Sequence, residues 1–220
     1  MKNFHIVTIF PEVFETYINT SMMWRAQKEK KVKFNFYNPR DFTKNKHNKV
    51  DDKPYGGGPG MVMTAQPILD AVKKALLKVK SQKSQVKIFI FSPSGKKFTN
   101  ATARGLANKY DHIVLICGRY EGVDARVKKI LKAEELSIGD YVLTGGEIPA
   151  MVVLDAVSRQ IEGVLGNDES LEEKRAASSE LYTRPEIIIF NKKSYRVPKV
   201  LLGGHHAKIE AWRTKKQKGK

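Results

Sequence analysis

The chain has little cysteine: Cys117 is the single one among 220 residues. One thiol cannot form an internal disulfide, and it cannot provide a cysteine-cluster metal site. The other candidate metal ligands are also poorly placed, because the adjacent His205 and His206 point apart on a helix and no carboxylate lies at ligand spacing. We expect a cytoplasmic protein without a metal site.

The sequence also lacks long apolar runs. Phe4–Phe10, near the amino terminus, is too short for a secretory segment and is followed by Pro11. Nothing later approaches the ~18 apolar residues of a membrane-spanning helix. We therefore expect no contact with a membrane.

Phosphate-loop motifs are missing as well. The glycine-rich run Gly56–Gly60 is not followed by Lys-Ser/Thr at P-loop spacing, and no Gly-x-Gly-x-x-Gly opens a helix after a strand. A nucleoside-triphosphate or dinucleotide site is therefore disfavoured.

Acidic residues are scarce relative to basic ones. Forty Lys and Arg stand against 23 Asp and Glu, which gives a formal net charge of +17. Such a field attracts phosphate polymers, so nucleic acid is the favoured partner. A lysine-rich surface that is simply solvated would give the same charge.

What is present predicts an α/β fold. Buried strands are expected at Phe4–Phe10, Val32–Tyr37, Val86–Phe91 and Ile113–Cys117, and an extended segment at Ser137–Leu143. Helices are expected from Pro11, at Gln66–Val79, from Thr99, from the turn Gly118–Arg126 and from Glu147. Strands that alternate with helices indicate a parallel sheet with helices on both faces.

The predicted organisation has three parts. Residues 1–161 form the α/β domain, and the polar, serine-rich residues 162–180 form a flexible linker. Residues 181–220 form a short, basic, helical C-terminal part.

Three turns are predicted to meet at the carboxyl ends of the strands, where parallel sheets bind ligands. They are Ser92–Gly95, Gly118–Gly122 and the stretch from Ile138 to Gly146. Backbone groups in such turns can bind an adenine edge and a ribose without charged side chains. This suits a sulfonium cofactor, which carries no phosphates.

The motifs in these turns closely resemble those of the bacterial tRNA (guanine-N1)-methyltransferases of the SPOUT superfamily. The matching runs are Ser-Ile-Gly-Asp-Tyr-Val-Leu-Thr-Gly-Gly-Glu-Ile-Pro-Ala-Met from Ser137, Cys-Gly-Arg-Tyr-Glu-Gly-x-Asp-x-Arg from Cys117 and Asp-Asp-Lys-Pro-Tyr-Gly-Gly-Gly-Pro-Gly from Asp51. Gly163–Asn167, Tyr182–Glu186 and Trp212-Arg213 match too, so the resemblance covers residues 4–213.

This resemblance implies a deep C-terminal trefoil knot, S-adenosyl-L-methionine as methyl donor, and a homodimer whose active site is shared between subunits. The implied substrate is N1 of the guanosine at tRNA position 37. The implied donor-binding residues are Ser92, Gly118, Glu121, Ile138, Gly139, Asp140, Tyr141, Val142, Leu143, Gly145 and Gly146.

Two catalytic residues are implied. Arg159 matches the family's arginine, and its planar cation can receive the negative charge that develops on guanine O6. The family's general base is an aspartate, but ungapped counting places Lys174 there, and a protonated lysine cannot accept a proton. A gap assigns the role to Glu173, or to Glu172, while a merely solvated acidic linker is the alternative.

The C-terminal part is shorter than is usual in the family, so we expect it to bind RNA mainly through electrostatic attraction. Two other functions remain open from the sequence. One is methylation of a different RNA target, such as a ribose 2′-hydroxyl. The other is a non-catalytic, basic RNA-binding protein with the same fold.

Overall fold

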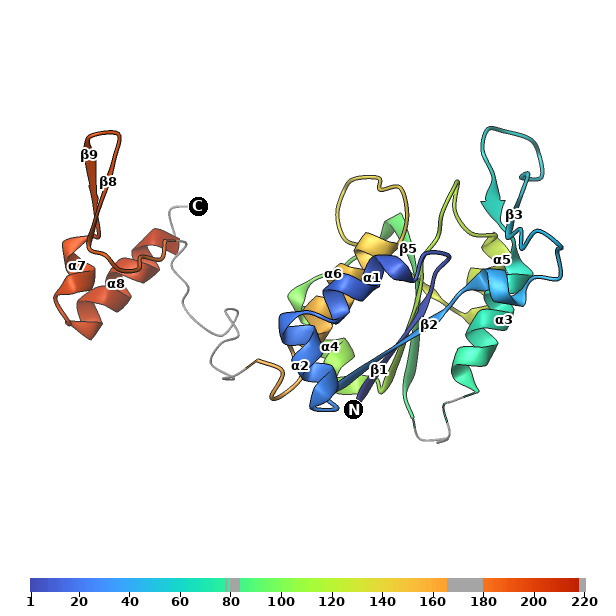
Figure 1. Cartoon of the computed structure of the whole chain (residues 1–220), viewed down its shortest axis with the longest axis horizontal. Coiled ribbons are helices and arrows are strands. Elements are labelled where there is room, and N and C mark those ends of the chain that lie inside the picture. Colours follow the sequence, from blue (N-terminus) through green and yellow to red (C-terminus); the bar gives the residue numbers. More distant parts are fainter. Residues whose placement is uncertain (78, 80–83, 166–179, 218–220) are drawn as a thin grey trace. The chain divides into compact units, whose positions relative to one another are not determined.

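The computed structural model describes residues 1–77, 79, 84–165 and 180–217 (Figure 1). The chain divides into two compact units, Met1–Gly166 and Asn167–Lys220. Most of the expected linker at 162–180 lies outside the described residues. Its first residues belong to the first unit, because Val164 is buried in the core there and its carbonyl accepts a hydrogen bond from Arg25 at 2.8 Å.

A five-stranded parallel sheet organises the first unit (Figure 1). Its strands are β1 (Lys2–Val7), β2 (Val32–Tyr37), β5 (Val86–Lys97), β6 (His112–Ile116) and β7 (Glu134–Ser137). They lie in the order β2-β1-β6-β5-β7, and each neighbouring pair is parallel. The predicted α/β class is therefore confirmed.

Helices cover both faces of this sheet, as predicted. The first face carries α1 (Glu12–Ile18), α2 (Ser21–Lys28), α4 (Asn100–Lys109) and α6 (Glu147–Ser158). The second carries α3 (Ala65–Leu76), α5 (Ala125–Leu131) and the short 3₁₀ helix η1 (Pro39–Phe42). Alternate residues of one strand supply the two cores: on β6, Ile113 and Leu115 face the first, and Val114 and Ile116 the second.

Side-chain caps fix where two helices begin after the strands. Thr99 Oγ1 accepts a hydrogen bond from the Thr102 amide at 3.2 Å and starts α4. Asp124 Oδ1 accepts one from the Arg126 amide at 2.9 Å and starts α5. Hydrogen bonds from the Arg126 side chain, above all, lower the pKa of Asp124. These caps place the turns that precede both helices.

Several predicted boundaries were wrong. The first strand ends at Val7 rather than Phe10, and the extended segment expected at Ser137–Leu143 is a strand only up to Ser137. Beyond it the backbone leaves the sheet, and the Tyr141 hydroxyl bonds back to the Ile138 carbonyl at 3.2 Å. The long loop predicted over residues 43–60 contains part of a small antiparallel pair, β3 (Asp51–Asp52) with β4 (Val62–Met63).

The second unit contains a hairpin that the sequence interpretation missed. Strands β8 (Ile187–Phe190) and β9 (Lys193–Arg196) pair antiparallel before helices α7 (Lys199–Leu202) and α8 (His206–Gln217). Asn191 and Lys192 both have positive φ, as a two-residue hairpin turn requires. The C-terminal part expected to be helical therefore contains two strands besides its helices. The rings of Tyr182 and Trp212 pack at 6.4 Å and tie the start of the unit to α8.

Candidate active site

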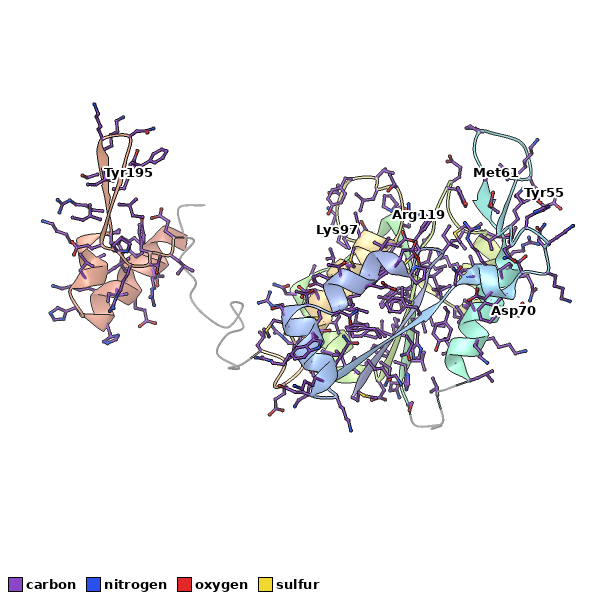
Figure 2. All side chains as sticks on the ribbon, in the orientation of Figure 1. Tyr55, Met61, Asp70, Lys97, Arg119 and Tyr195 are labelled. Atoms are coloured by element: carbon purple, nitrogen blue, oxygen red, sulfur yellow. The ribbon has the colours of Figure 1, made fainter. Side chains whose placement is uncertain are left out.

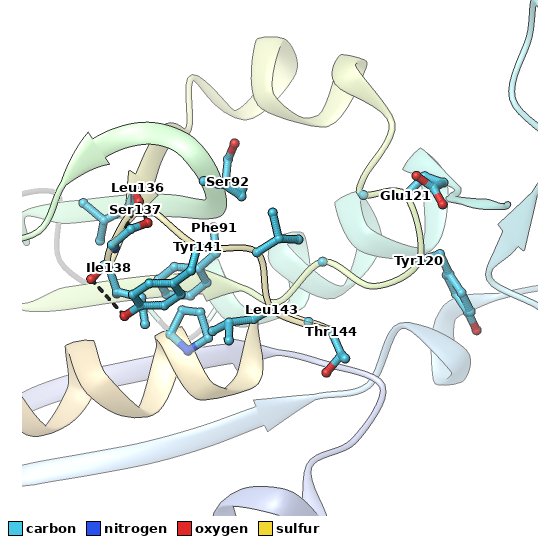
Figure 3. A pocket seen from close by; sticks show the side chains of 18 residues that line it. Phe91, Ser92, Tyr120, Glu121, Leu136, Ser137, Ile138, Tyr141, Leu143 and Thr144 are labelled. Carbon is cyan, nitrogen blue, oxygen red and sulfur yellow. Dashed lines mark hydrogen bonds between the residues drawn. The ribbon is translucent and has the colours of Figure 1, made fainter. Parts of the chain in front are cut away.

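One cavity is lined by the middle of β5, by the turn Gly118–Gly122 after β6 and by the loop that follows β7. Its volume is about 240 Å³. The turn predicted at Ser92–Gly95 was wrong, because β5 continues to Lys97 and its pairing with β7 shifts register between Phe91 and Lys96. Figure 3 shows Tyr141 lying beside Ile138 and Ser137, with Tyr120 and Glu121 at the other end of the lining. The predicted donor-binding residues that line it are Ser92, Gly118, Glu121, Ile138, Gly139, Tyr141, Val142, Leu143, Gly145 and Gly146.

Asp140 is the predicted donor-binding residue that does not line this cavity. Its carboxylate instead pairs with Lys97 Nζ at 2.5 Å, and both side chains are largely exposed. The pair joins the end of β5 to the loop before α6. Because it is solvated, it contributes little stability.

Other lining residues were not singled out from the sequence. Phe91 and Leu136 come from the strands themselves, and Pro149 comes from the first turn of α6. Tyr120 also lines the cavity, and its φ of 59° is unusual for a tyrosine. Its place between Gly118 and Gly122 was the available signal, since strained backbone gathers at binding sites.

Two glycines let the turns pack against each other. A Cβ on Gly146 would lie 2.6 Å from Cys117 Cα, and the Gly146 amide donates to the Gly118 carbonyl at 2.9 Å. A Cβ on Gly145 would lie 2.3 Å from Arg119 Nε. Arg119 and Gly145 also form an antiparallel bridge. These glycines are therefore needed for turn-to-turn contact, whatever the ligand.

A buried carboxylate stands behind these turns. Glu147, at the start of α6, is 1% exposed. Its Oε1 accepts a hydrogen bond from Thr8 Oγ1 at 2.7 Å, and its Oε2 accepts one from Arg119 Nε at 2.9 Å. The guanidinium of Arg119 lies over the Phe10 ring at 4.7 Å from the centroid. Glu147 thus links the end of β1 to both turns.

The neighbouring thiol is unsuited to chemistry. Cys117 is buried, and burial above all, with the Glu147 charge nearby, raises its pKa well above the usual range. A thiol in this state is a poor nucleophile. Cys117 therefore acts as a packing residue under the turns.

The charge of the lining limits which ligands fit. Among the residues that the structure assigns to the cavity wall, Glu121 is the only ionisable acid, and none is Lys or Arg. In a chain of net charge +17 this is a marked local exception. The glycine backbone and apolar walls fit an adenosine carrying a positive sulfonium, and they do not fit a polyphosphate.

The two predicted catalytic residues are not in the cavity. Arg159 is the C-cap of α6, ten residues after Pro149, which lines the cavity, so the helix rises roughly 15 Å between them at 1.5 Å per residue. Within the described part of the chain, the Arg159 side chain makes no ion pair or hydrogen bond. Glu173, like Glu172 and Lys174, lies outside the described residues.

The described residues include no candidate metal site and no candidate membrane span. No group of three or more His, Cys, Asp or Glu side chains among the described residues could hold a metal ion. Within the same part of the chain, every helix is too short or too polar to cross a bilayer.

The exposed loop ahead of β4 carries a separate basic surface. Tyr55 is fully exposed there (Figure 2), and Lys44, Lys46, Lys49 and Lys53 lie on the same loop. Exposed aromatic rings among cations are typical of surfaces that bind single-stranded nucleic acid.

The fold and the cavity together define a class: α/β proteins with a parallel sheet and a cavity lined by glycine-containing loops beyond the strands. Comparison with known proteins then identifies the family. The model described as tRNA (Guanine-1)-methyltransferase TrmD matches residues 1–220, and the chain belongs to this family.

Curated relatives agree with this assignment. A protein of Caldanaerobacter subterraneus subsp. tengcongensis is 48% identical over 97% of this chain and 86% of its own length. One of Ruminiclostridium cellulolyticum is 49% identical over 96% and 88%. One of Buchnera aphidicola is 46% identical over 98% and 90%. Each is named tRNA (guanine-N(1)-)-methyltransferase.

Proposed function

We propose that the protein transfers a methyl group from S-adenosyl-L-methionine to N1 of the guanosine at position 37 of tRNA. The name shared by its relatives supports tRNA as substrate and guanine N1 as acceptor. The observation that carries the choice of donor is the cavity wall, which is built from glycine turns and lacks Lys and Arg among its assigned residues.

The donor, when bound, supplies a methyl group on a positively charged sulfur. Backbone groups of Gly118 and of the loop from Ile138 to Leu143 would hold its adenosine, between the apolar side chains of Phe91 and Leu136. Glu121 is the acidic residue at this wall, so it would favour the positive charge.

Two residues would serve the acceptor base. The carboxylate of Glu173 would take the proton from guanine N1, and the nitrogen electron pair would then form the bond to the methyl carbon as the sulfur keeps the pair of the broken bond. The Arg159 guanidinium would stabilise the negative charge that builds on O6.

The position of Arg159 supports a homodimer with a shared active site. Because α6 rises roughly 15 Å between Pro149 at the cavity and Arg159, the arginine of a partner subunit would complete the site. Large apolar side chains are exposed nearby on packed helices, Ile148 and Val152 on α6 and Val13 and Tyr17 on α1. We expect sedimentation to give a dimer for the parent and dissociation for Val152→Lys; a monomeric parent would contradict this.

The knot belongs to the same proposal. The chain leaves β7 at the sheet edge, passes the end of β6 where Gly146 meets Cys117, and reaches Thr8 at the end of β1 through Glu147. This return across the strand ends supports the deep trefoil knot expected from the family. A cytoplasmic location is part of the proposal, because tRNA is the proposed substrate.

The deciding experiment is methyl transfer to tRNA transcripts that differ only at position 37. We expect 1-methylguanosine with guanosine at this position and no product with adenosine. A transcript with 2′-deoxyguanosine there should still be methylated, because the reacting atom is on the base. Methylation without the guanosine would indicate another RNA target, and donor binding without turnover would indicate a non-catalytic RNA-binding protein.

A further inference from the structure

The link between Arg119 and Glu147 joins two walls of the cavity. Gly118 and Tyr120 line it on either side of Arg119, and Gly145 and Gly146 line it directly before Glu147. The Arg119 and Glu147 side chains do not line the cavity themselves. They stand behind the wall and join at 2.9 Å.

The contacts form a closed ring. The Phe10 amide donates to Thr8 Oγ1 at 3.0 Å, the Thr8 hydroxyl donates to Glu147, and Glu147 accepts from Arg119. The Arg119 guanidinium lies over the Phe10 side chain, which closes the ring of contacts. The ring of contacts therefore holds the two turns to the end of β1, an inner strand of the sheet.

The turns need such a link because their sequence allows many backbone conformations. Glycine backbones populate many conformations, and Gly118, Gly122, Gly139, Gly145 and Gly146 all lie in the two walls. A buried ion pair is itself a weak source of stability, since apolar replacements often stabilise as well. The Arg119–Glu147 pair is better explained by its selection of one arrangement of the two turns.

We propose that Arg119 and Glu147 are positioning residues that fix the spacing of the two glycine turns and so set the affinity for the methyl donor, an inference that rests on the proposed function. Without the pair, the turns would sample several spacings, and the donor would bind only to the fraction that is correctly spaced.

The variants separate positioning from plain stability. Glu147→Gln removes the charge at nearly constant size. The double variant Arg119→Gln/Glu147→Gln leaves no unpaired buried charge, so its thermal stability should recover relative to Glu147→Gln. Glu135→Gln is the matched control, because Glu135 pairs with Lys128 at the surface of the same unit.

Two readouts are needed. Hydrogen exchange of the free protein should become at least ~10-fold faster in peptides covering 118–122 and 138–146, and stay unchanged in α3. Calorimetry should find S-adenosyl-L-methionine bound about 10- to 100-fold more weakly by both Gln variants, the worth of a charge-assisted hydrogen bond, with an unchanged KM for tRNA. The Glu135→Gln control should match the parent in both.

Each other outcome overturns the inference. If donor affinity recovers together with stability in the double variant, the pair is only structural. If exchange in the two turns is unchanged, the pair does not set their spacing. If the parent itself binds no S-adenosyl-L-methionine while the turns respond to the variants, the proposed function fails and the donor role falls with it.

Discussion

Replacing Gly145 with alanine tests how tightly the two turns are packed. The new Cβ would lie 2.3 Å from Arg119 Nε, 2.6 Å from Arg119 Cδ and 2.7 Å from Glu147 Oε2. Arg119 has to move away, and the carboxylate of Glu147, which is 1% exposed, loses its charged partner. Breaking a buried ion pair in this way costs about 3–5 kcal/mol.

That loss is large for a domain, since whole stabilities are typically about 5–15 kcal/mol. At roughly 2–4 °C per kcal/mol for a chain of this size, we expect the melting temperature to fall by about 6–20 °C. Calorimetric melting and urea unfolding would both measure it. Gly146→Ala should be at least as harmful, because its Cβ meets the backbone of Cys117 rather than a side chain that can rotate.

The matched control is Gly105→Ala on α4, where a Cβ meets nothing within 4 Å. Alanine should stabilise that helix by roughly 0.5–1 kcal/mol. If Gly145→Ala and Gly105→Ala differ by less than about 1 kcal/mol in unfolding free energy, the argument from turn packing is refuted.

Three further predictions concern pH, salt and catalysis. Burial lowers the pKa of His112, whose Nδ1 lies 3.0 Å from His5 Nε2. As the pH falls below about 6.5, the unfolded chain therefore binds a proton at this residue before the folded protein does, and the free energy of unfolding falls. Urea unfolding should show stability declining from pH 7 to 5.5, and a flat profile would contradict this. Affinity for tRNA should fall steeply with salt, with a log–log slope of roughly −0.7 to −0.9 per phosphate contact; a salt-independent affinity in filter binding would exclude the electrostatic account. Single-turnover transfer should slow by about 10²–10⁴ in Glu173→Gln and comparably in Arg159→Lys, and a parent-like rate for Glu173→Gln would move the base elsewhere.

The framework of the fold was predictable because its signals are local. A short apolar run such as Ile113–Ile116 predicts a buried strand. Pro11 and the residues after Gly146 indicate where helices begin. Two of the three expected turns were predictable because glycines cluster after β6 and after β7. Within the cavity, this information was enough to locate most of the wall.

Other features depend on contacts that the sequence does not display. The hairpin turn at Asn191 and Lys192 was missed because lysine is uncommon at positive φ. The role of Glu147 depends on Thr8, which is 139 residues away. Asp140 was assigned to the donor site by the family resemblance, but its carboxylate pairs with Lys97 at the surface. These features are determined by packing and pairing between residues that are far apart in the sequence.

The strand order has a consequence for how the chain is made. Strand β1 lies between β2 and β6, and roughly 80 residues separate the end of β2 from the end of β6. At about 5–20 residues per second, a ribosome needs roughly 4–16 s to supply the missing neighbour. During that time the edge of β1 that pairs with β6 has no partner strand, and an open edge is a template for pairing with other chains. The nascent protein is therefore exposed to aggregation at mid-synthesis, before β6 pairs with β1.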